Sequence, residues 1–164
     1  MKPMRNILLA TFLTIVVITA VSYTACNKNK CASVVCQNHG VCNNGNCVCP
    51  VGFEGNRCEV LSRDKFIFTY NGGDTCSNEG YRQYSIRLLA VPGDSVELKM
   101  KNFLNNLQDS AICTIRATDS FTFQGSNNAT TYSGTGKLNH DTLVMYYNVT
   151  QDTTSFSCIY VGGQ

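Results

Sequence analysis

The stretch CASVVCQNHGVCNNGNCVCPVGFEGNRC, residues 31–58, carries six of the chain's ten cysteines, spaced Cys31-x4-Cys36-x5-Cys42-x4-Cys47-x-Cys49-x8-Cys58. A segment this short cannot bury enough apolar surface to fold unaided. Cross-links must therefore restrict its unfolded state, each contributing about 2–4 kcal/mol. Six cysteines can pair in many ways, and spacing alone does not choose among them. The stretch predicts a small disulfide-stabilised module in an oxidising compartment.

The same stretch resembles the EGF-like domain family in more than its cysteines. Asn38–Cys42 (NHGVC) matches the family's glycine turn before the third cysteine, and Cys49–Cys58 (CPVGFEGNRC) matches its closing motif. The resemblance implies a two-stranded hairpin and a smaller C-terminal loop. It also implies three disulfides: Cys31–Cys42, Cys36–Cys47 and Cys49–Cys58.

No metal or other cofactor is expected. Some EGF-like domains bind calcium through acidic ligands just before the first cysteine, but Lys30 occupies that place here, and calcium prefers several anionic oxygen ligands. His39, Cys47 and Cys49 do not have the spacing of a common zinc site. A calcium-binding EGF-like protein is kept as the less favoured alternative.

The N-terminus has the features of an export signal. Lys2 and Arg5 precede an apolar run, Ile7–Val21, that is shorter than a membrane-spanning helix needs. Ser22–Cys26 (SYTAC) resembles the lipobox of bacterial lipoproteins, although Tyr23 stands where that family prefers Leu. The resemblance implies a signal peptide over residues 1–25 and acyl chains such as palmitate on Cys26. An ordinary secretory signal and an uncleaved anchor are the alternatives.

The expected location is the cell envelope, either the outer membrane or the cell surface, with the chain lipid-anchored through Cys26. If Cys26 is not lipidated, the protein is secreted. Residues 26–30 would be a short tether between the lipid and the EGF-like domain at 31–58. Loss of Lys2 and Arg5 lowers the 13 basic residues to 11, which equals the 11 acidic residues, so nucleic acid is not an expected partner.

Residues 59–64 read as a linker, and residues 65–164 as an antiparallel β-domain. Ser95–Lys101 and Thr142–Val149 alternate apolar and polar side chains, as half-buried strands do. Phe121 and Phe123 mark a third such face. Further strands are expected at 65–70, 82–91, 112–117, 130–138 and 155–161, and turns at 71–74, 92–94, 117–119, 126–128 and 139–141. The predicted fold class is all-β: a disulfide-rich module followed by an antiparallel barrel or sandwich of about eight strands.

The β-domain resembles the small, lipocalin-like domains of cell-envelope lipoproteins from Bacteroidetes-type bacteria. The residues that carry this resemblance are Thr75-Cys76, Gly134–Leu138, Asp141–Leu143 and a terminal strand with Cys158. Three cysteines remain for this domain. Cys113 lies on an apolar strand face, as a buried free thiol does, so a Cys76–Cys158 disulfide is predicted, with Cys76–Cys113 as the alternative.

Chemistry-bearing motifs are sparse, and enzymatic activity is not expected. His140-Asp141 could be a base and its orienting carboxylate, but the pair is read as turn residues. Four Asp-Ser/Thr pairs resemble bacterial O-glycosylation sequons, with candidate acceptors Ser95, Ser110, Thr142 and Thr153. The leading hypothesis is a membrane-anchored lipoprotein whose EGF-like spacer presents a β-domain to an unknown protein, glycan or small-molecule partner. The alternative is a structural or assembly component of the envelope without a ligand.

Overall fold

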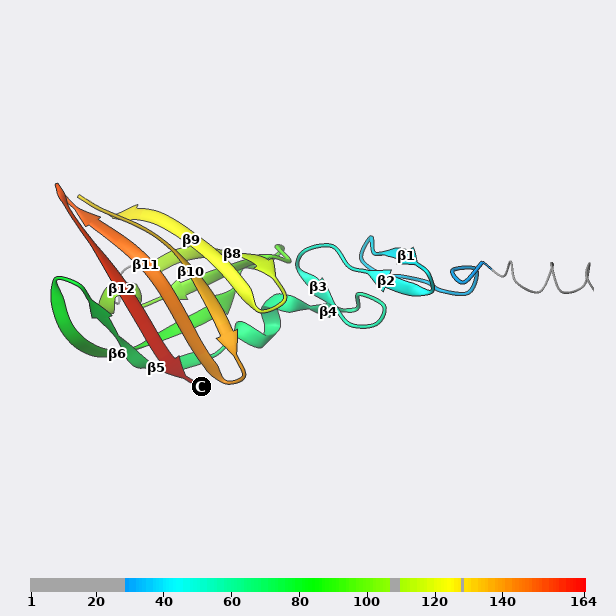
Figure 1. Ribbon diagram of the computed structural model, residues 1–164, viewed down its shortest axis with the longest axis horizontal. Helices are drawn as coiled ribbons and strands as arrows, with labels where there is room; N and C mark the ends of the chain where they lie inside the picture. Colours follow the sequence, from blue (N-terminus) through cyan, green and yellow to red (C-terminus); the bar gives the residue numbers. More distant parts are fainter. Residues whose placement is uncertain (1–28, 107–109, 128) are drawn as a thin grey trace, which may run out of the picture.

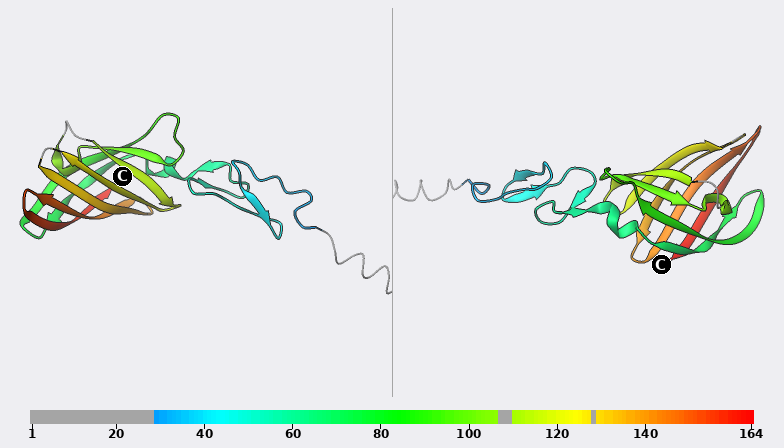
Figure 2. Two further views of the ribbon diagram at one scale, coloured as in Figure 1. Left: turned by 90° about the horizontal axis from the view of Figure 1, so that it is seen from above. Right: turned by 180° about the vertical axis from the view of Figure 1, so that it is seen from behind.

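The computed structural model describes residues 29–106, 110–127 and 129–164. It contains a small disulfide-rich module followed by a closed barrel of eight antiparallel strands (Figure 1). The predicted all-β fold class is confirmed, and the β-domain is a barrel rather than a sandwich. The module projects from one end of the barrel in every view (Figure 2).

The disulfide-rich module has almost no hydrophobic core. Its first hairpin pairs β1 (Val41–Asn43) with β2 (Asn46–Val48), and its second pairs β3 (Phe53–Glu54) with β4 (Val60–Leu61). Asn44 and Gly45 form the first turn with φ of 52° and 92°, which suits the Asn-Gly hairpin turn. Cys58 is the one buried hydrophobic side chain among residues 29–61. Cross-links therefore replace packing, as disulfides join Cys31 to Cys42, Cys36 to Cys47 and Cys49 to Cys58.

The barrel is an up-and-down meander in which each strand pairs with the next along the chain. The last strand then pairs with the first, β12 with β5, which closes the sheet. Its strands are β5 (Thr69–Cys76), β6 (Glu79–Ala90), β7 (Glu97–Lys101), β8 (Ser110–Ala117), β9 (Ser120–Asn127), β10 (Thr130–Asn139), β11 (Thr142–Gln151) and β12 (Thr154–Gly163).

Two local predictions near the start of the barrel are wrong. Residues 65–70 were expected as a strand, but Ser62–Phe66 form a 3-10 helix, η1, and β5 begins at Thr69. Residues 71–74 were expected as a turn, yet they lie inside β5. The glycines allow close backbone approach there: a Cβ on Gly72 would overlap the carbonyl oxygen of Val161 on β12, and one on Gly73 that of Arg82 on β6.

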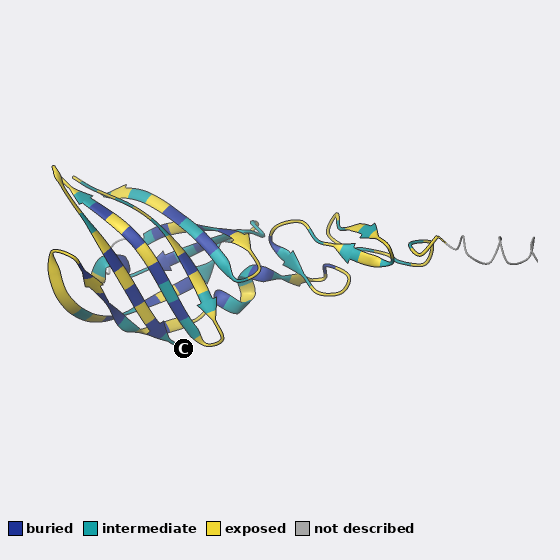
Figure 3. Cartoon of the chain, viewed as in Figure 1, coloured by how far each residue is buried: buried dark blue, intermediate teal, exposed yellow. Residues whose placement is uncertain are grey.

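The barrel interior is filled by side chains. Alternate residues of each strand point inward, which gives the regular burial pattern in Figure 3. Phe66 of η1 enters the end beside the module, with its ring centroid 5.5 Å from that of Phe121. Phe103 of a second 3-10 helix, η2 (Phe103–Asn105), packs at 5.2 Å from Phe123 and 5.1 Å from Tyr147. An eight-stranded barrel is just wide enough for its side chains to fill it.

Residues 59–64, the segment expected to be a linker, lie at the junction between module and barrel. Polar contacts from this segment and from Lys65 reach both the module and the barrel. Ser62 N donates to Gly52 O at 2.9 Å, and Lys65 Nζ lies 2.7 Å from Glu54 Oε2. The guanidinium of Arg63 donates to the carbonyl oxygens of Val91 and Asp94 in the β6–β7 connection, and to that of Glu97 at the start of β7. These contacts fix the second hairpin of the module against the barrel.

Candidate functional site: an uncharged groove on the barrel wall

The structure brings together some of the residues that the sequence singled out. Cys76 and Cys158 face each other on the paired strands β5 and β12 and form a disulfide with a Cα–Cα distance of 4.1 Å. Cys113 is a buried free cysteine on β8, where burial raises the pKa of its thiol. An inert thiol of this kind has a packing role. Cys26 lies outside the described residues.

The histidines and the glycosylation candidates lie at turns and strand entries. His140 occupies the β10–β11 turn with φ of 53°, and its Nδ1 is 3.0 Å from Asn139 Oδ1. Thr153 is exposed in the β11–β12 turn. Ser110 and Thr142 are half-buried first residues of β8 and β11, and Ser95 is half-buried just before β7. Glycosylation at these four positions stays a prediction.

Asp74 is a buried charge that the sequence interpretation missed. Its side chain is fully buried, and the Arg82 guanidinium donates to it twice, from Nε to Oδ1 and from Nη2 to Oδ2, each at 3.1 Å. Tyr84 donates to Oδ2 at 2.8 Å, and Tyr147 donates to the same oxygen. Burial, and then the nearby Asp74 carboxylate, raise the pKa of Tyr84. These contacts satisfy the carboxylate and tie β5, β6 and β11 together inside the barrel.

Charge is distributed unevenly around the barrel strands. Strands β6, β7 and β8 carry seven charged residues: Glu79, Arg82, Arg87, Glu97, Lys99, Lys101 and Arg116. In β9–β12, Lys137 is the one charged residue within the strands. The outward positions of β9–β12 are mostly Ser, Thr, Asn and Gln.

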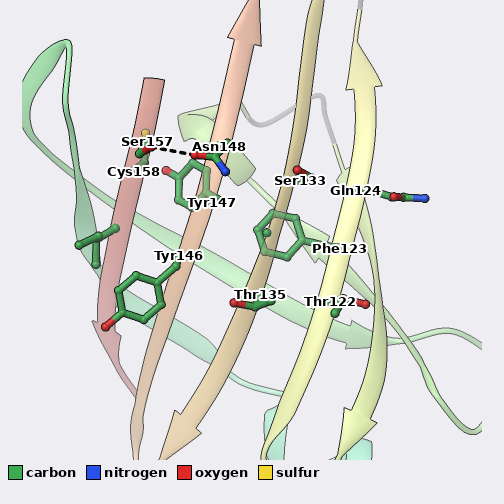
Figure 4. Close-up of a pocket in the computed structure, with 12 residues that line it drawn as sticks. Thr122, Phe123, Gln124, Ser133, Thr135, Tyr146, Tyr147, Asn148, Ser157 and Cys158 are labelled. Atoms are coloured by element: carbon green, nitrogen blue, oxygen red, sulfur yellow. Dashed lines mark hydrogen bonds between the residues drawn. The ribbon is translucent and has the colours of Figure 1, made fainter. Parts of the chain in front are cut away.

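A groove of about 620 Å³ lies on this uncharged wall. Its outward-facing lining forms two rows that cross the four strands in register. Figure 4 labels every residue of the two rows except Ile159. One row is Thr122–Thr135–Tyr146–Ile159, and the other is Gln124–Ser133–Asn148–Ser157. The first row offers an aromatic ring and an aliphatic side chain, and the second offers amides and hydroxyls.

The groove surfaces are open to solvent and partly organised by hydrogen bonds. Tyr146 is 57% exposed and Ile159 46% exposed. Ser157 Oγ donates to Asn148 Oδ1 at 2.8 Å, which orients the amide in the second row. Two cations lie at the borders: Lys137 pairs with Asp119 at 3.2 Å, and Arg116 donates to the neutral hydroxyl Thr122 Oγ1 at 3.0 Å.

The described residues contain no group of three or more His, Cys, Asp or Glu placed to hold a metal ion. The amide oxygen of Asn29, just before the module, accepts a hydrogen bond from the backbone N–H of Cys31 at 3.0 Å. No helix in the described part of the chain has the length and apolarity to cross a membrane.

Comparison with known proteins assigns the first module. The family model of the EGF-like domain matches residues 26–58. The chain therefore contains an EGF-like domain. A neurogenic locus notch homolog protein of Giardia intestinalis (strain ATCC 50803 / WB clone C6) is 47% identical over 36 residues, which are 22% of this chain and 6% of that protein. The chain thus matches a small fraction of that relative's length.

A solved structure resembles the chain in outline. It is a crystal structure described as that of a candidate outer membrane protein from Bacteroides fragilis NCTC 9343, with 12% sequence identity and a TM-score of 0.42. The match covers 63% of this chain and 52% of that one.

Proposed function

We propose that the protein is an exported lipoprotein of a bacterial cell envelope, anchored through Cys26, in which the EGF-like domain is a spacer that presents the barrel to a partner. The observation that carries the proposal is the junction. Contacts of Ser62, Arg63 and Lys65 join the module to one end of the barrel, which supports a fixed spacer rather than a loose linker. A spacer with a fixed attachment keeps the barrel away from its anchor point.

The N-terminal sequence supports the anchoring part of this proposal. Only four residues separate Cys26 from Cys31, the first disulfide-bonded cysteine of the module. A lipid on Cys26 would leave a short tether, and several acyl chains at about 0.8 kcal/mol per buried CH₂ hold a protein firmly on a membrane.

The partner is expected to bind the barrel wall rather than the barrel interior. Phe66 and Phe103 belong to the buried side-chain cluster of the interior, and the Asp74 carboxylate is satisfied by protein donors. This packed interior also favours the second candidate function, a structural envelope component without a ligand. The open groove on β9–β12 favours partner binding.

Anchoring is tested with Cys26→Ser in the native host, followed by cell fractionation and intact-mass measurement. The proposal expects the unmodified chain in membranes, with a mass that includes acyl groups, and the variant in the soluble fraction. Cys113→Ser is the matched control, because its thiol is buried in the barrel. Equal membrane retention of the Cys26→Ser variant would contradict lipid anchoring.

Display of the barrel at the cell surface is tested by adding a protease to intact cells, with a periplasmic protein as a control for lysis. Cleavage that releases the barrel while the control survives supports display at the surface. Complete protection of the barrel contradicts it.

A further inference from the structure

We infer that the groove on β9–β12 binds a neutral oligosaccharide. The inference names the partner class for the presenting role proposed above, but it rests on the groove and not on the lipid anchor. Four properties of the barrel wall support it: the pairing of its strands, the missing charge, the chemistry of the two rows, and the shape that the register gives them.

Strand pairing restricts how a ligand can be recognised in the groove. There β10 pairs with both β9 and β11, and β11 pairs with both β10 and β12. Addition of a partner strand requires a free sheet edge, and a ligand that lies across these strands meets backbone groups that are already paired. A ligand on the wall must therefore be recognised by outward side chains.

The missing charge restricts the ligand further. Solvent-facing strand positions usually carry charged side chains, as β6–β8 do here. The groove lining has none: Lys137 at its border is paired with Asp119, and Arg116 lies outside the lining on β8, where its Nε donates to the Thr122 hydroxyl. An anionic ligand would find no free cation in the groove lining, and a cationic ligand would find no carboxylate there. A neutral ligand suits this lining best.

The two rows together suit a ligand that has both polar and apolar groups. A purely apolar ligand would cover the hydroxyls and amides of Gln124, Ser133 and Asn148 without hydrogen-bonding to them, which is costly. A sugar hydroxyl both donates and accepts, as these side chains do. The C–H groups on the face of a sugar ring can pack on the electron-rich face of Tyr146 and against Ile159.

Register makes the rows continuous and gives the groove its length. Thr135 pairs with Tyr146 and Tyr146 with Ile159, while Ser133 pairs with Asn148 and Asn148 with Ser157. Four strands spaced about 4.8 Å apart give rows about 14 Å long, separated by about 7 Å along the strands. That shape fits a short chain of sugar rings lying across the strands.

Tyr146→Thr and Tyr81→Thr form a matched pair for the test. Tyr81 is 63% exposed on β6, outside the groove, so its replacement removes the same side chain from the same barrel. Threonine keeps a strand-forming residue at both sites. Ser133→Arg is a third variant, which fills the groove from its other row with a charged side chain.

The experiment titrates the isotope-labelled full chain in detergent micelles with neutral hexasaccharides of glucose, mannose, galactose and N-acetylglucosamine. Amide chemical shifts give both the Kd and the residues affected. Hexagalacturonate is the anionic comparator. We expect at least one neutral probe to perturb β9–β12, with about a tenfold rise in Kd for Tyr146→Thr. Tyr81→Thr should change the Kd by less than about twofold, and Ser133→Arg should abolish binding.

Four results would overturn the inference. They are no binding by any of the four neutral probes, binding of hexagalacturonate at least as tight as that of the best neutral probe, an unchanged Kd for Tyr146→Thr, and concentration-dependent self-association that covers the same groove residues. The last would mean that a second copy of the chain occupies the groove. If the protein binds the sugar but carries no lipid at Cys26, the anchoring proposal is wrong and the inference about the groove still holds.

Discussion

Replacement of Arg82 by Met tests whether the buried carboxylate of Asp74 depends on its cation. Asp74 is fully buried and accepts two hydrogen bonds from Arg82 at 3.1 Å. Removal of one partner from a buried ion pair costs about 3–5 kcal/mol. Arg82 is 35% exposed, and Tyr84 and Tyr147 remain as donors. We therefore expect a loss near the lower end, about 3 kcal/mol of unfolding free energy.

Near-ultraviolet circular dichroism of the tyrosines is the suitable assay. All tyrosines of the described residues lie in the barrel, so their signal follows barrel unfolding separately from that of the EGF-like domain. A loss of about 3 kcal/mol should lower Tm by about 10–20 °C in a domain of this size. Lys137→Met is the control, because it removes the cation of an exposed ion pair with Asp119 and should cost about 0.5 kcal/mol or less.

A second substitution separates the loss of charge balance from the loss of packing. Asp74→Asn in the Arg82→Met background leaves a neutral side chain that still accepts hydrogen bonds from Tyr84 and Tyr147. The double variant should then be more stable than Arg82→Met alone by about 1 kcal/mol or more. The reasoning is refuted if Arg82→Met and Lys137→Met lower Tm equally, or if Asp74→Asn restores nothing.

Three further outcomes follow from the barrel interior. Gly136→Ala should cost about 1–3 kcal/mol, because a Cβ there would overlap the buried Phe121 ring, whereas Gly80→Ala, with no atom within 4 Å of the new Cβ, should be nearly neutral; denaturant titration compares the two. Removal of the Cys76–Cys158 disulfide, which spans 82 residues, should cost the barrel about 4–5 kcal/mol, while removal of Cys36–Cys47 should leave the tyrosine transition unchanged. Burial raises the pKa of Tyr160 to about 12 from its ordinary value of 10.0, so the folded state holds this phenolic proton more tightly than the unfolded state does. The contribution of Tyr160 to stability should be constant below pH 10 and should fall as the pH rises toward 12; a series of Tm values against pH checks this, and a Tyr160→Phe variant whose Tm falls just as steeply would contradict the assignment.

Alternation in the sequence predicted which side chains enter the barrel. Leu98 and Met100 on β7, and the odd-numbered residues from Leu143 to Val149 on β11, are buried as their spacing indicated. Odd or even position along a strand is enough to assign a side chain to the inside or the outside of an up-and-down barrel. This assignment was not made at residues 71–74, where two glycines suggested a turn. The same parity, carried through from Tyr70 to Cys76, would have placed Asp74 inside.

The groove was harder to predict because it depends on register as well as parity. The two-residue turn at His140-Asp141 places Asn139 opposite Thr142, so the pairing of Thr135 with Tyr146 follows by counting along a hairpin. The tight turn between Gln151 and Thr154 sets the β11–β12 register in the same way. The near absence of charge from 120 to 163 was visible in the sequence. The β5–β12 pairing, in contrast, closes the barrel between distant parts of the chain, and no local turn determines its register.

The position of the groove gives the proposed spacer a physical purpose. The rows lie on the wall of the barrel, whereas the EGF-like domain joins one end of it (Figures 1 and 4). A wall site on a barrel seated directly at a membrane would lie close to headgroups and to neighbouring proteins, which would hinder a chain-like ligand. The EGF-like domain has little core of its own, but three disulfides cross-link it, and Arg63 and Lys65 fix it to the barrel. It can therefore hold the barrel wall away from the membrane surface. On this reasoning, a flexible Gly/Ser insertion between Leu61 and Ser62 should leave sugar affinity in detergent unchanged and reduce binding by the membrane-anchored protein. An equal loss of affinity in both settings would place the effect in the barrel itself and remove the spacer from the explanation.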